Sequence, residues 1–258
     1  MEVSEFDLGL KGKVALVINA TDGLGLACAE ALAAEGAEVW IDGPSKVLTG
    51  RVVADLAVKG IQVYHFDGDL ESYEGGDAAT VHPQFDILVN NFGPLPFENF
   101  GRFDEKIVQR FIERTMVAAN KVAAVALDSM IAKKWGRIVN IAFELLGPPI
   151  QSPDFSHAVH NQLTDMVSEV AGNAISPNVT INNLLPGLIE TKHLQQYLDA
   201  IATDGRSFQE VSDAVAAATA SGRFGKPSEL GAFCAFICSQ PASQITGQNL
   251  LVDGGGAI

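Results

Sequence analysis

The sequence predicts an α/β fold, a doubly wound parallel sheet of seven strands that forms a single domain over residues 1–258. Three observations lead to this prediction. Short runs rich in Val, Ile and Leu recur along the chain, helical stretches separate them, and the first run ends in a glycine-rich turn. Runs that do not alternate with polar residues are typical of strands that are buried on both faces by crossover helices.

The strands are expected where these apolar runs occur, and the helices where longer Ala- and Leu-rich stretches lie between them. The strand runs, in order, are residues 14–18, 38–41, 63–66, 86–90, 137–142, 179–185 and 249–252. The helical stretches include 26–36, 111–134, 160–172 and 229–239.

One segment, from about residue 191 to 225, departs from this alternation because it is inserted between the sixth strand and the last helix. Its Ala-rich part, 210–222, is expected to be helical. In α/β folds the ligand crevice lies beyond the carboxyl ends of the strands, so this segment borders the crevice either as a lid or as a plain surface helix.

Composition narrows the possible partners. Seventeen Lys and Arg against 31 Asp and Glu give a net charge of −14, which disfavours binding to nucleic acid and to anionic membranes. No apolar run reaches the ~20 residues of a membrane-spanning helix, and the acidic amino terminus is unlike a secretory signal. We therefore expect a cytoplasmic protein. Cys234 and Cys238 could form a redox pair or half a metal site, but buried packing is the favoured interpretation.

Several short motifs lie where the predicted strands end. Residues 19–25 form a glycine-rich turn that leads into a helix, an arrangement that lets backbone N–H groups approach a pyrophosphate. Asp69-Leu70 follow the third strand and 90–93, Asn-Asn-Phe-Gly, the fourth. Pro186-Gly187 and Thr191 follow the sixth strand, and ITGQNLLVDGG stands near the end of the chain.

This set of motifs resembles the short-chain dehydrogenase/reductase family over essentially the whole chain. The resemblance implies a protein that binds NAD or NADP and transfers hydride to or from an alcohol or carbonyl carbon. It also implies a tetramer built through two long helices and the last strand. The positions that match the family's dinucleotide contacts are Asn19, Asp22, Leu24, Asp42, Asp69, Leu70, Asn91, Gly93, Pro186, Gly187, Ile189 and Thr191.

The cofactor positions depart from the family pattern in three places. Ile18-Asn19 replaces Thr-Gly, although Asn tolerates the left-handed backbone that such a turn needs. Phe92 replaces a small Ala, and Asp42 stands one position earlier than the family's usual acid. We expect that no cofactor is required, that residual NAD(H) binding remains, and that NADP(H) is disfavoured because no Arg is present to meet a 2′-phosphate.

The family's catalytic positions carry other residue types. The family spacing places its Asn, Ser, Tyr and Lys at Thr115, Phe143, Ser156 and His160. A tyrosine with an ordinary pKa of about 10 works in the family because a neighbouring ammonium lowers that pKa. Serine is too weak an acid for this role, and losing one general acid costs about 10² to 10⁴ in rate.

These replacements predict a chain without catalytic residues at the family positions. We expect it, by itself, to lack appreciable dehydrogenase activity. The expected role is an inactive subunit, a pseudoenzyme, that joins an active homologue in a heterotetrameric NAD-dependent dehydrogenase of the hydroxyacyl type, with an acyl-CoA substrate as one option.

Two alternatives stay open from the residues themselves. Ser156 and His160, four apart on one helix face, could form a hydroxyl–imidazole pair for a lyase, isomerase or hydrolase, with Glu144 or Asp154 orienting the ring. The other alternative is a nucleotide-sensing protein that binds its nucleotide through Asp42, Asp69 and Thr191. His157 with His160 lacks a third ligand at a recognisable spacing, so no metal site is expected.

Overall fold

The computed structural model describes residues 7–67, 84–91, 93, 118–141, 176–202 and 205–255. These residues form a seven-stranded sheet in the order β3-β2-β1-β4-β5-β6-β7. All neighbouring strands pair in parallel. The chain therefore winds outward from β1 first to one side and then to the other, which confirms the predicted fold class.

Each apolar run that the sequence singles out forms one of these strands. The long central strands β5 and β6 are buried along their whole length, as expected for strands covered on both faces. The strands are β1 (Val14–Val17), β2 (Glu38–Ile41), β3 (Val63–His65), β4 (Ile87–Asn91), β5 (Gly136–Ile141), β6 (Val179–Pro186) and β7 (Asn249–Val252).

Helices fill the connections that the structure describes. The predicted stretches at 26–36 and 229–239 form α1 and α9, and part of 111–134 forms α5. The stretch at 160–172 lies outside the described residues. The helices are α1 (Gly23–Ala34), α2 (Lys46–Val58), α5 (Ala118–Lys133), α7 (Lys192–Ile201), α8 (Phe208–Ala217) and α9 (Pro227–Cys238).

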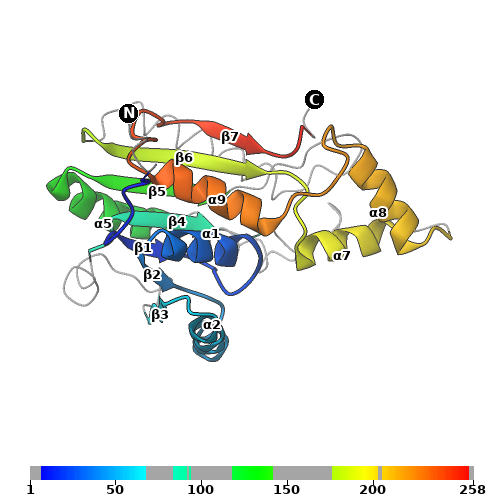
Figure 1. Ribbon diagram of the computed structural model, residues 1–258, viewed down its shortest axis with the longest axis horizontal. Helices are drawn as coiled ribbons and strands as arrows, with labels where there is room; N and C mark the ends of the chain where they lie inside the picture. Colours follow the sequence, from blue (N-terminus) through cyan, green and yellow to red (C-terminus); the bar gives the residue numbers. More distant parts are fainter. Residues whose placement is uncertain are drawn as a thin grey trace, which may run out of the picture.

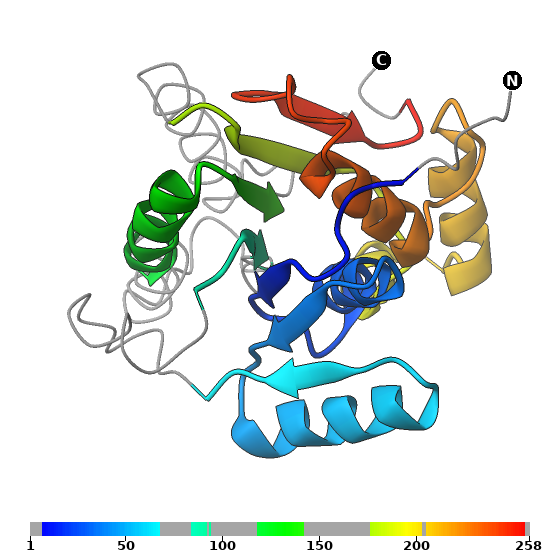
Figure 2. The same ribbon diagram turned by 60° about the vertical axis from the view of Figure 1, so that its left-hand side comes forward.

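The helices cover the sheet from both sides (Figure 2). Side chains of α1, α2 and α9 pack on one face together with alternate strand residues such as Val17, Val39 and Val139. On the other face α5 packs against Leu16, Leu88 and neighbouring strand residues. Successive side chains of a strand point to opposite faces, so one run of apolar residues supplies both cores.

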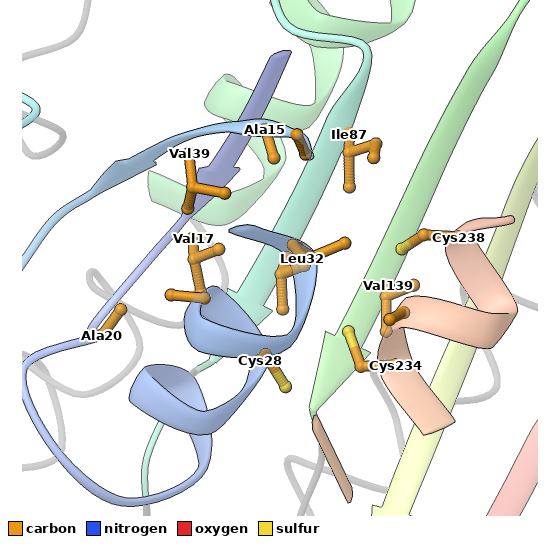
Figure 3. Packing of buried hydrophobic residues seen from close by; sticks show 14 of the residues in the cluster. Ala15, Val17, Ala20, Cys28, Leu32, Val39, Ile87, Val139, Cys234 and Cys238 are labelled. Carbon is orange, nitrogen blue, oxygen red and sulfur yellow. The ribbon is translucent and has the colours of Figure 1, made fainter. Parts of the chain in front are cut away.

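The contact between α1 and α9 is close and contains the three cysteines. Cys28 on α1 faces Cys234 and Cys238 on α9 (Figure 3), and all three are buried and free. A Cβ atom at Gly231 would collide with the backbone of Ala27, so the two helices approach at a distance that only glycine permits. The pKa of the Cys238 thiol is raised by its hydrogen bond to Cys234 and by burial, which keeps the thiol protonated. These findings agree with the interpretation of Cys234 and Cys238 as buried packing residues.

The amino edge of the sheet, where the strands begin, is closed by a buried cation. The side chain of Arg137 on β5 has no exposed surface and donates to the carbonyls of Gly136 and Asn178 at 2.8 Å and of Ser239 at 3.3 Å. At the same edge Asp86 accepts from the N–H of Val14 at 3.0 Å and pairs with Lys133 at 2.8 Å.

The inserted segment contains α7 and α8, which lie beyond the carboxyl ends of the strands (Figure 1). Leu194, Leu198 and Val211 form a small core between these two helices. Whether the segment acts as a lid stays a prediction, as does the single-domain boundary. Among the described residues, no helix combines the length and apolar character needed to cross a membrane. A cytoplasmic location stays a prediction.

Candidate functional site

The phosphate turn, residues 18–25, runs from the end of β1 into α1. Ile18 and Ala20 tie it to the neighbouring strands by donating to the carbonyls of Val89 and Asp42 at 2.9 and 2.8 Å. Asn19 has φ 53°, so the expected left-handed conformation is present. The predicted turn therefore forms with asparagine in place of glycine.

Gly25 and Asn91 hold this turn in a compact cradle. The side-chain N–H of Asn91 donates to the carbonyl of Asn19 at 3.0 Å. A Cβ atom on Gly25 would lie 2.5 Å from that carbonyl oxygen and 2.7 Å from Nδ2 of Asn91. The close approach of α1 to the turn is therefore possible only with glycine at position 25, which is what a cradle for a pyrophosphate needs.

The side chain of Asn19 points toward the end of β4. Its Nδ2 atom lies 3.2 Å from where a Cβ atom on Gly93 would be, and Gly93 has φ +67°. The asparagine thus fills part of the space between the phosphate turn and residue 93. Leu24 is half-buried and packs against the core beneath the turn.

The other wall of the site is the segment that follows β6. Pro186 and Gly187 are buried, and a Cβ atom on Gly187 would lie 2.6 Å from Cα of Asp253. Ile189 is buried and forms a β-bridge with Gly225. The hydroxyl of Thr191 caps α7 by accepting from the N–H of Leu194 at 3.2 Å.

These two walls meet at the start of α1. A Cβ atom on Gly23 would lie 3.7 Å from Cγ2 of Thr191. Lys192 forms an ion pair with Asp22, with Nζ and Oδ2 3.3 Å apart. The structure therefore brings together Asn19, Asp22, Asn91, Gly93 and Thr191, while their role as dinucleotide contacts stays a prediction.

The loop after β2 closes the site on the side of β2 and β3. Asp42 belongs to the strand pair, because its N–H donates to Val17 and its carbonyl accepts from Ala20. Gly43 packs so closely on Thr21 and Thr49 that a Cβ atom would collide with Thr21. Lys46, in the first turn of α2, forms an ion pair with Asp67 after β3.

A ladder of four asparagines crosses the sheet below the site, and the sequence reasoning missed it. Nδ2 of Asn90 donates to Asn140 at 2.8 Å, Asn140 donates to Asn183 at 2.9 Å, and Asn183 donates to Asn249 at 2.7 Å. Each of the four neighbouring strands contains at least one asparagine, and this pattern could have revealed the ladder once the register was known. We name these residues, Asn90, Asn140, Asn183 and Asn249, the asparagine ladder.

Several predicted site residues lie outside the described residues. They are Asp69, Leu70, Phe92, Thr115, Phe143, Glu144, Asp154, Ser156, His157 and His160. Within the described ranges, no group of three or more His, Cys, Asp or Glu side chains is arranged to hold a metal ion. Tyr197 on α7 is half-buried, and burial raises its pKa.

The family of this chain follows from comparison with known proteins. The family model described as enoyl-(acyl carrier protein) reductase matches residues 18–256. The chain belongs to the short-chain dehydrogenase/reductase family. The 3-oxoacyl-(acyl-carrier-protein) reductase of Aquifex aeolicus is 30% identical to this family member over 256 residues, which cover 96% of this chain and 99% of the relative.

Two further relatives match along almost their full length. The D-β-hydroxybutyrate dehydrogenase of Cupriavidus necator is 30% identical and covers 95% of this chain and 98% of its own length. The crystal structure of L-sorbose reductase from Gluconobacter frateurii, in complex with NADPH and L-sorbose, superposes with a TM-score of 0.86. It is 28% identical, and the match covers 98% of this chain and 99% of that chain.

These relatives overturn the expectation of an inactive subunit that is no enzyme by itself. That expectation is wrong because proteins that match along their whole length are reductases and dehydrogenases. It rested on the four residue types at positions 115, 143, 156 and 160. A proton can also reach a substrate from another group within hydrogen-bond reach or through one water, so those four residues do not decide whether the chain is an enzyme.

The cofactor expectation is also wrong, both in requiring no cofactor and in disfavouring NADP(H), because the L-sorbose reductase is an NADPH complex. The prediction against NADP(H) was based on the absence of an arginine after β2. The loop after β2 leads to another cation, Lys46 in the first turn of α2, so a positive charge is present on this side of the site. The expected partnership with an active homologue in a heterotetramer remains a prediction, as does the expectation that nucleic acid and membranes are not bound.

Proposed function

We propose that this chain is an oxidoreductase that uses a nicotinamide dinucleotide to interconvert a secondary alcohol and a carbonyl compound. The observation that carries the proposal is the cradle formed by Gly25, Asn19 and Asn91. Because Gly25 has no Cβ atom to collide with the carbonyl of Asn19 and with Asn91, α1 can begin close against the turn, an arrangement that fits the approach of a pyrophosphate to the backbone N–H groups.

The described residues fit such a dinucleotide in three places. The backbone N–H groups at the start of α1 would hold its diphosphate, helped by the positive end of the helix dipole. Ile189 and Thr191 would border it on the side of β6, and the loop from Asp42 to Lys46 on the side of β2. When bound, the nicotinamide ring supplies or accepts the hydride.

The substrate class follows from the chemistry that the relatives' names share. A 3-oxoacyl group, a β-hydroxybutyrate and a ketose sugar each carry a ketone or the corresponding secondary alcohol. This supports a keto or hydroxy substrate bound beside the inserted segment, where α7 and α8 border the carboxyl edge of the sheet.

The rate is expected to be low because the family's tyrosine and lysine positions hold Ser156 and His160. A well-placed general acid contributes about 10² to 10⁴ in rate, so turnover should fall below that of a family member with those residues by up to this factor. An imidazole with an ordinary pKa of about 6.5 can donate a proton near neutral pH. His160→Ala therefore tests whether the remaining proton transfer uses that ring.

Calorimetric titration of the purified chain with NADPH and NADH tests the binding half of the proposal. Both dinucleotides are expected to bind. Lys46→Met should lower the affinity for NADPH by about fivefold and leave the affinity for NADH unchanged, because an exposed charge contact is worth up to about 1 kcal/mol. Lys59→Met is the matched control, since Lys59 caps the opposite end of α2. Absence of heat with both dinucleotides would overturn the proposal.

Turnover is then measured by following the absorbance of the reduced dinucleotide with acetoacetyl-CoA, 3-hydroxybutyrate and L-sorbose as probes. Slow, dinucleotide-dependent conversion of at least one probe is the expected result. Gly25→Ala provides the control, because it should weaken dinucleotide binding by about tenfold or more and lower turnover at a limiting dinucleotide concentration along with it. Tight dinucleotide binding with no conversion of any keto or hydroxy probe would contradict the oxidoreductase assignment.

A further inference from the structure

The ion pair between Lys192 and Asp22 joins two segments that are far apart in the sequence. Lys192 is the first residue of α7, and Asp22 directly precedes α1. Their side chains are 80% and 63% exposed, with 3.3 Å between Nζ and Oδ2. An exposed pair of this kind is weak and exchanges readily, so the Lys192 ammonium is available to a stronger anion.

Asp22 does not do what an aspartate at its position usually does. It occupies the N-cap position of α1, yet its side chain makes no capping hydrogen bond. By contrast, Ser45, Thr191 and Ser207 all cap their helices through the side-chain oxygen. The Asp22 carboxylate is paired with Lys192 instead, which leaves the first-turn N–H groups of α1 for another acceptor.

The backbone on the side of Lys192 is firmly held. Thr191 caps α7, Ile189 forms a bridge with Gly225, and the N–H of Glu190 donates to the carbonyl of Gly225 at 2.8 Å. Gly23 and Thr191 lie side by side at the junction. Lys192 can therefore change partner by moving its side chain alone, while its backbone stays beside the phosphate turn.

We infer that Lys192 binds the diphosphate of the dinucleotide, and that in the free protein Asp22 holds this lysine at the site and competes for it. The inference rests on the proposed dinucleotide binding. A diphosphate carries two negative charges next to α1, whereas Asp22 offers one. Binding therefore transfers Lys192 from the carboxylate to the diphosphate and leaves Asp22 facing solvent.

The test compares Lys192→Met and Asp22→Asn with the unmodified chain, using calorimetric titration with NADPH and with ADP-ribose. ADP-ribose keeps the diphosphate and lacks the nicotinamide. Lys192→Met should lower the affinity for both ligands by about fivefold. Asp22→Asn should raise the affinity for both by about twofold to fivefold, as expected for single exposed charge contacts. Lys192→Met should also reduce the dependence of the dissociation constant on salt.

The matched control is the ion pair of Lys59 with Glu30, which also involves α1 and joins an exposed lysine to a half-buried glutamate. Lys59→Met and Glu30→Gln should leave both affinities unchanged. If Lys192→Met and Asp22→Asn weaken binding equally, the pair only braces the two segments and the inference is wrong. Unchanged affinity in both variants overturns it as well. A failure of the unmodified chain to bind either ligand contradicts the proposed function instead.

Discussion

The amino and carboxyl edges of the sheet differ in how far their polar groups are already hydrogen-bonded within the protein. At the amino edge Arg137 and Asp86 are buried and bonded to backbone groups of neighbouring segments. At the carboxyl edge Asn19 adopts a left-handed backbone, and Asp22 leaves the start of its helix uncapped. The amino edge therefore contributes stability, whereas the carboxyl edge keeps backbone donors available for a ligand.

The largest effect is expected at the amino edge. Arg137→Met keeps an unbranched apolar stem but removes the guanidinium and with it the donors to three carbonyls. The free energy of unfolding should fall by about 3 kcal/mol, because buried acceptors lose their partners. Denaturant unfolding measures this, and NADPH affinity should stay unchanged. If the variant has the same free energy of unfolding as the original chain, the conclusion that the amino edge contributes stability is wrong.

The asparagine ladder, which runs across β4, β5, β6 and β7 at one level of the sheet, should give a smaller effect. Asn183→Ala leaves Asn140 without its acceptor and Asn249 without its donor, so we expect a loss of about 2 kcal/mol. Asn249→Ala at the exposed end of the ladder is the control and should cost less than about 1 kcal/mol. Equal losses in both variants would mean that the ladder is not a buried unit.

At the carboxyl edge the expected loss is in binding. Gly25→Ala places a Cβ atom 2.5 Å from the carbonyl of Asn19, so NADPH affinity should fall by about tenfold or more as the cradle opens. Gly50→Ala is the control, because a Cβ atom at that position in α2 meets nothing within 4 Å. It should raise the free energy of unfolding by about 0.5–1 kcal/mol and leave calorimetric binding unchanged.

The smallest effect concerns pH. Glu229 at the start of α9 bonds to Arg223 and to the N–H of Lys226, which lowers its pKa from 4.5 to about 2. Its stabilising effect is therefore complete above pH 4.5 and disappears as the pH falls through about 2. The difference in melting temperature between the original chain and Glu229→Gln should shrink over this range. A difference that stays constant down to pH 2 would contradict the assignment.

Much of the fold could be predicted because strands buried on both faces leave a strong pattern, such as the run Val14–Val17. Helices α2 and α7 were not predicted separately. The α2 sequence carries a weak cue, because it contains Gly50 and several β-branched residues, which favour helix poorly. The α7 sequence carried a usable cue, since it is amphipathic and follows the N-cap Thr191. The phosphate turn was predictable, including the left-handed Asn19, because local backbone chemistry decides it.

The rest of the site depends on contacts between residues that are distant in the chain. The pair of Lys192 with Asp22 spans 170 positions, and the asparagine ladder needs the register of four strands. Neither local propensity nor spacing contains that information. The same limit explains the errors about activity and cofactor, since they treated single positions such as Asp42 and Ser156 as decisive.

The close contact at Gly231 has a consequence for how the molecule responds to a ligand. Because α9 touches the backbone of α1 where no side chain fits, α1 cannot slide or tilt without separating two helices around the buried thiols. We therefore expect α1 to stay in place when a ligand binds, and any closure upon a substrate to come from α8 and the carboxyl-terminal part of α7, which share a small core of their own, while the start of α7 stays beside the phosphate turn.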